Sequence, residues 1–182
     1  MRCEVAAFPE RAKQLILPTL ARLWAQQGET VMQGSLGRNA IMGFIAAVIA
    51  VVTVHQGIVY LLNQQGVIPV KAWNMAGVPP WGVPTIINSI FWGGLWGALF
   101  GLIHDKLPGG ALWLKGLIYG LCIVVISNWI LLPLIKSNVF GVPNQVYFAG
   151  GVPMRLLAGA LILGGFGLAT GILYGLLNSR KS

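Results

Sequence analysis

Hydrophobic residues along this chain fall into four long segments that are almost free of charge. A hydrocarbon core about 30 Å thick is crossed by roughly 20 apolar residues in a helix, and a helix satisfies its own backbone hydrogen bonds in lipid. We therefore predict an all-α membrane protein built as a bundle of four transmembrane helices. The predicted spans are approximately Ala40–Leu62, Pro84–Ile103, Leu114–Ile135 and Met154–Leu177.

Composition excludes a soluble domain. Hydrophobic residues make up 56% of the 182 positions and charged residues only 9%, whereas a soluble domain carries about 25% charged residues. Cys3 and Cys122 lie far apart and form no metal-binding or redox motif.

The basic residues predict the orientation of the chain. If the N-terminus is cytoplasmic, three of the 12 Lys and Arg residues face outward, namely Lys71, Lys136 and Arg155. The other nine lie on the cytoplasmic side, which is the positive-inside pattern. We therefore expect both termini in the cytoplasm. The net charge of +8 reflects this asymmetry, and we expect no nucleic-acid partner.

Residues 1–38 form a separate N-terminal segment. Its apolar residues Ile16, Leu20, Leu23 and Trp24 fall on one helical face, although Pro18 would kink such a helix. This pattern predicts an amphipathic helix on the cytoplasmic face of the bilayer, with a docking surface for a partner protein as the alternative. We expect two transmembrane hairpins to follow, in residues 39–110 and 111–182.

The two predicted hairpins resemble each other in sequence. A shift of 73 positions superposes Gly43 on Gly116 and His55 on Asn128, and each half carries Gly-Val-Pro just before its second span. We infer an internal duplication. Both hairpins begin on the same side, so their pseudo-two-fold axis is expected along the membrane normal, unlike the inverted repeats of many transporters.

Glycines in the second and fourth spans recur every four residues. Small residues allow membrane helices to approach closely, and close packing drives much of their association. We expect the second and fourth spans to meet along these glycines, with contact to another subunit as the alternative. A shift of 74 positions superposes the two triplets, Gly93, Gly97, Gly101 and Gly167, Gly171, Gly175.

Polar residues inside the spans are candidates for function. His55 and Gln56 lie in the first span, and Ser127 and Asn128 occupy the corresponding part of the third. The favoured interpretation is a structural hydrogen bond from His55 to Asn128 or Ser127. The alternatives are a proton relay or an axial ligand to haem or another pigment. The other histidine, His104, lies at the cytoplasmic end of the second span, most of a membrane thickness away from His55. The two histidines cannot bind one metal ion together, so we expect no metal site.

No residue pattern in the chain indicates catalysis. Asp105 is the only acid beyond residue 29, so a pair of carboxylates for acid–base chemistry is lacking. We expect that the protein is not an enzyme. The outward loops are rich in proline, which restricts the backbone. We expect them to fold over the bundle, anchored by Trp73, Trp81 and Phe148, or to bind a partner.

Three stretches of the first hairpin resemble a family of small bacterial inner-membrane proteins of unknown function. The resemblance implies location in the bacterial cytoplasmic membrane and brings no activity, substrate or cofactor. It covers about a third of the chain, through Val54-His55-Gln56-Gly57, Val78-Pro79-Pro80-Trp81-Gly82-Val83-Pro84 and Phe91-Trp92-Gly93-Gly94-Leu95-Trp96-Gly97.

Two classes of function remain open from the sequence. The first is a non-catalytic subunit or accessory protein of a larger membrane complex, held by a membrane-protein partner or as a homo-oligomer. Binding of haem or pigment through His55 would be a variant of this class. The second is a small channel or transporter for a neutral solute, whose path runs past His55 and Asn128.

Overall fold

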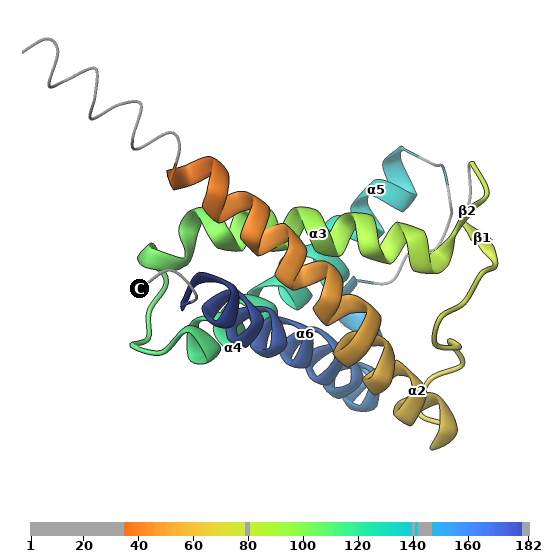
Figure 1. Ribbon diagram of the computed structural model, residues 1–182. Coiled ribbons are helices and arrows are strands. Elements are labelled where there is room, and N and C mark those ends of the chain that lie inside the picture. Colours follow the sequence, from red (N-terminus) through yellow and green to blue (C-terminus); the bar gives the residue numbers. More distant parts are fainter. Residues whose placement is uncertain (1–34, 79–80, 140, 142–146, 180–182) are drawn as a thin grey trace, which may run out of the picture. The chain divides into compact units, whose positions relative to one another are not determined.

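The protein is described by a computed structural model over residues 35–78, 81–139, 141 and 147–179 (Figure 1). Four helices in this part of the chain are long and apolar enough to cross a membrane: Ser35–Gln64, Thr85–Lys106, Leu112–Asn138 and Pro153–Ser179. The predicted all-α class is therefore confirmed, and each predicted span matches one of these helices. The predicted amphipathic helix lies largely in residues 1–34, outside the described part. The compact unit Asn39–Ser182 is described below.

The first and third long helices each contain a π-helical segment. In the first helix, η1 (Val51–His55) precedes α2 (Gln56–Gln64). In the third, η3 (Val124–Leu131) follows α4 (Leu112–Ile123) and precedes α5 (Leu132–Asn138). The two segments begin 73 positions apart, which is the offset that the sequence repeat predicts.

The π-helical geometry is visible in the hydrogen bonds that close each segment. The backbone N–H of Gln56 donates to the carbonyl of Val51, and that of Leu132 donates to Ser127, five residues back in both cases. Both segments open with β-branched residues, Val51-Val52-Thr53-Val54 and Val124-Val125-Ile126, which crowd the preceding turn of an α-helix.

In the first hairpin, glycines bring the two helices into backbone contact. A side chain on Gly43 would overlap the Gly97 carbonyl, and one on Gly101 would overlap the Asn39 carbonyl. Gly97 itself lies against Ala47. The second helix of this pair consists of α3 (Thr85–Ile103) and the short η2 (His104–Lys106).

The second hairpin repeats these contacts between α4 and α6 (Pro153–Ser179). A side chain on Gly116 would overlap the Gly167 carbonyl, and one on Gly171 would overlap the Leu112 carbonyl. The residues of the first helix in each pair are thus related by a shift of 73, as predicted. Those of the second helix are related by a shift of 70 rather than 74, one helical turn away from the sequence alignment.

These contacts correct the predicted pairing of the second and fourth spans. The glycines of α3 and α6 do not form a common seam, because each stripe lies against the preceding helix of its own hairpin. Gly93 is the member that also approaches the other hairpin, at Phe166. The sequence correctly marks surfaces of close approach but does not specify the neighbouring helix.

Aromatic side chains fill the core where the two hairpins meet. The Phe100 ring packs edge-on against Tyr174 of α6 and lies tilted against Tyr119 of α4, with ring centroids 5.6 and 5.3 Å apart. The Tyr119 hydroxyl donates to the Trp96 carbonyl at 2.7 Å. These aromatic residues join three of the four long helices, and Ala46, Ala47, Ala50 and Val51 of the first long helix belong to the same buried cluster.

The loop between α2 and α3 contains a short antiparallel ladder that the sequence analysis did not predict. Strand β1 (Gly77–Val78) pairs with β2 (Val83–Pro84) in antiparallel register, with Gly77 opposite Pro84 and Val78 opposite Val83. The later loop contains the helical turn η4 (Tyr147–Gly151), in which Phe148, Ala149 and Gly150 have left-handed backbone angles.

Candidate functional site

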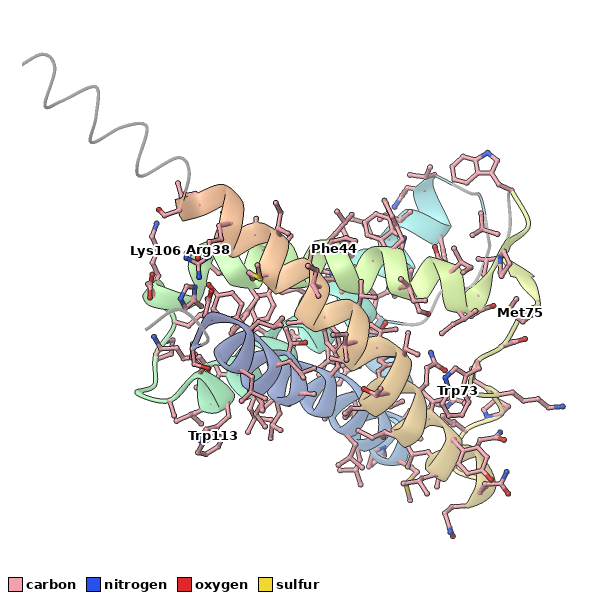
Figure 2. All side chains as sticks on the ribbon, in the orientation of Figure 1. Arg38, Phe44, Trp73, Met75, Lys106 and Trp113 are labelled. Carbon is pink, nitrogen blue, oxygen red and sulfur yellow. The ribbon has the colours of Figure 1, made fainter. Side chains whose placement is uncertain are left out.

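Gln56 holds the first long loop against the π-helical segment η1. Its side chain is 6% exposed, and its Oε1 accepts the backbone N–H of Trp73 at 2.8 Å. The Trp73 indole N–H donates to the Val52 carbonyl at 3.1 Å. Trp73 has a φ of 47°, a left-handed conformation that is uncommon for a non-glycine residue. One backbone and one indole hydrogen bond therefore hold Trp73 beside the first helix (Figure 2).

His55 faces the fourth long helix. Its ring meets Phe166 edge-on with centroids 6.3 Å apart, and one turn further on, Ile58 packs against Gly165. The amide nitrogen of Gln56 lies 3.5 Å from His55 Nδ1. Because a carboxamide nitrogen only donates, Nδ1 is the acceptor of this contact. His55 thus forms part of the packing between the two hairpins.

Ser127 and Asn128 do not bond to His55, contrary to the sequence-based interpretation. Within the described ranges, the Asn128 side chain has no hydrogen-bond partner and is exposed, whereas Ser127 is half-buried. The polar pair of the first helix faces inward, and Asn128 faces away from the bundle. The structure therefore does not bring the four predicted residues together.

The two π-helical segments nevertheless share a contact with their loops. Position 56 in the first helix corresponds to 129 in the third, and Trp129 packs against Phe148 with ring centroids 6.1 Å apart. Phe148 has a φ of 47°, like Trp73. In each hairpin, an aromatic loop residue with a left-handed backbone therefore contacts the same repeat position: Trp73 contacts Gln56, and Phe148 contacts Trp129.

The loop anchors are only partly those expected from composition. Trp73 and Phe148 contact the helices as predicted, but Trp81 is 83% exposed and anchors nothing in the described part of the chain. The contact between Trp73 and Gln56 was missed. The sequence signals for this contact are the matching β-branched runs of the first and third helices and the aromatic residue in the loop that follows each of them. The path of the loop between the two signals depends on the φ of Trp73.

His104 belongs to the aromatic core and lies away from His55. Its ring meets Tyr174 edge-on with centroids 4.8 Å apart. Its Nδ1 lies 3.0 Å from the Gly101 carbonyl oxygen, and its Nε2 lies 3.2 Å from an Asp105 carboxylate oxygen. Among the described residues, no cluster of three or more His, Cys, Asp or Glu side chains could hold a metal ion.

Comparisons with known proteins bring no relative. No protein-family model matches the chain, and no match was found among curated proteins or solved structures. The functional argument therefore rests on the chain's own residues and on the sequence resemblance of the first hairpin.

Proposed function

We propose that this chain is a non-catalytic integral membrane protein that serves as a subunit or accessory protein of a larger membrane complex. Its four long apolar helices support membrane insertion. The distribution of Lys and Arg supports cytoplasmic termini, and the family resemblance supports the bacterial cytoplasmic membrane.

The opposite placement of His55 and Asn128 carries this proposal. A solute path between the repeats would need both polar positions on one continuous surface. Instead, His55 lies against Phe166, whereas Asn128 is on the outward surface. The core between the helices is filled by buried apolar residues such as Val51 and Phe100. This arrangement favours a protein that binds partners through its outer faces over one that conducts a solute through its centre.

Purification from native membranes tests this proposal. The full chain, tagged and expressed at its natural level, is extracted in mild detergent, and its particle mass and protein composition are measured. The account predicts a stoichiometric assembly that contains other membrane proteins. A tagged Trp81→Ala chain is the matched control, because Trp81 is 83% exposed, and it should recover the same assembly. Particles composed of this chain alone would overturn the proposal, and solute flux in liposomes would then favour a channel.

A further inference from the structure

Asn128 is an exposed polar residue within a membrane-spanning helix. At about 1.5 Å per residue, it lies about 20 Å along the helix from Lys115 and about 12 Å from Lys136. These two charged residues bracket a length close to a hydrocarbon core of roughly 30 Å. Asn128 therefore lies inside the apolar layer, on the side of Lys136.

The surroundings of Asn128 give its carboxamide no hydrogen-bond partner within the described part of the chain. The neighbouring exposed side chains of η3 and α5 are all aliphatic, namely Ile126, Ile130, Leu131 and Leu132. A carboxamide exposed to hydrocarbon loses its hydrogen bonds to water and gains nothing in return. The hydrogen-bonding groups of Asn128 are therefore unsatisfied when a single chain is surrounded by lipid.

In the first hairpin, the equivalent polar residues have partners within the chain. There, His55 packs on Phe166 of α6, and Gln56 accepts a hydrogen bond from the loop. In the second hairpin, Trp129 packs against Phe148, but Asn128 is exposed and has no hydrogen-bond partner in the described part of the chain. The repeat thus leaves one of its two polar positions open.

We propose that the face of η3 around Asn128 is the contact surface for a second copy of this chain. All copies insert in the same orientation, so a two-fold axis along the membrane normal brings Asn128 opposite Asn128 at the same depth. A carboxamide both donates and accepts, so the two side chains form reciprocal hydrogen bonds across a self-complementary interface. A different partner would need its own polar group at that depth. The inference rests on the proposed function, because it identifies one member of the assembly.

Disulfide cross-linking in native membranes tests this interface. In full-length protein carrying Cys3→Ser and Cys122→Ala, Leu132→Cys places a thiol about one turn from Asn128. Leu95→Cys on α3 is the matched control, since both leucines are 43% exposed. Mild oxidation should join two chains through Leu132→Cys and leave the Leu95→Cys chains monomeric. Absence of the Leu132→Cys dimer, or equal dimer from both variants, would contradict the proposal.

Substitution of Asn128 separates the carboxamide from the surrounding apolar face. Loss of two hydrogen bonds of the strength measured between membrane helices should weaken dimerisation about tenfold in Asn128→Leu, whereas Asn128→Gln should retain it. Both variants should fold, because this side chain is exposed; size-exclusion chromatography checks this. Cross-linking that is unchanged in Asn128→Leu would overturn the proposed hydrogen bonds. Cross-linking of Leu132→Cys to a different protein would overturn the second copy but leave the accessory role. A dimer purified without other proteins would support the second copy but overturn the accessory role.

Discussion

Gly43 lies directly against the backbone of Gly97, with no room for a side chain between them. The same relationship joins Gly116 to Gly167 in the second hairpin. The repeat therefore preserves a helix–helix contact as well as a sequence pattern. Because close packing and hydrogen bonds hold membrane helices together, we infer that these contacts close each hairpin.

Gly97→Ala and Gly167→Ala should each destabilise the protein. The added methyl group would overlap Gly43 and Ala47 in the first variant, and Gly116 and Gly120 in the second. Overpacking of this kind costs about 1–3 kcal/mol. Thermal unfolding in detergent measures the effect. Gly57→Ala is the control, because a side chain there meets no atom within 4 Å; equal loss of stability in all three variants would contradict the packing.

Loss of Tyr119 or Phe100 should weaken the joint between the hairpins. Tyr119→Phe removes the hydrogen bond to Trp96 and should cost about 1 kcal/mol. Phe100→Ala should cost about 3–5 kcal/mol, because a fully buried ring leaves a cavity. Phe91→Ala, at an exposed position of the same helix, should change the unfolding temperature little. A larger effect from Phe91 than from Phe100 would place the core elsewhere.

Trp73→Phe and Gln56→Leu should each loosen the first loop. The former removes the indole donor to Val52, and the latter removes the acceptor of the Trp73 backbone N–H. Each loss corresponds to about 1 kcal/mol. Hydrogen exchange of the loop amides should quicken in both variants. Trp81→Phe serves as the control and should leave exchange unchanged; unaltered exchange in all three would show that Trp73 does not hold the loop.

His55→Ala should lower thermal stability and leave the purified assembly unchanged in composition. The imidazole packs on Phe166, so truncation removes contacts between the hairpins. Thermal unfolding and mass spectrometry of the native particle check the two parts. Loss of a bound chromophore from this variant would favour the alternative in which His55 is an axial ligand.

The four long helices could be predicted from the sequence because span length and the absence of charge are local properties. The glycines likewise indicate smooth surfaces, as Gly97 and Gly167 illustrate. Their neighbours could not be predicted, because a smooth stripe is compatible with any helix that approaches it. The alignment error of one turn has the same origin: glycines recur every four residues, so several shifts match.

The polar positions show a further limit of the sequence. Equivalent positions in a repeat suggested that His55 and Asn128 face each other. However, the direction of each side chain depends on how the π-helical segments and neighbouring helices pack. The docking of Trp73 also depends on a backbone angle that composition does not specify, and the same composition wrongly suggested Trp81 as an anchor.

The account depends most directly on four spans that place both long loops on one side of a membrane. Single cysteines at three exposed positions test this in protein lacking Cys3 and Cys122: Met75→Cys and Val139→Cys in the loops, and Asp105→Cys in the turn between the hairpins. A membrane-impermeant maleimide should label the two loop variants in intact cells and the Asp105 variant only after permeabilisation. Labelling of Met75→Cys and Val139→Cys from opposite sides of the membrane would contradict the arrangement of two hairpins in the same orientation.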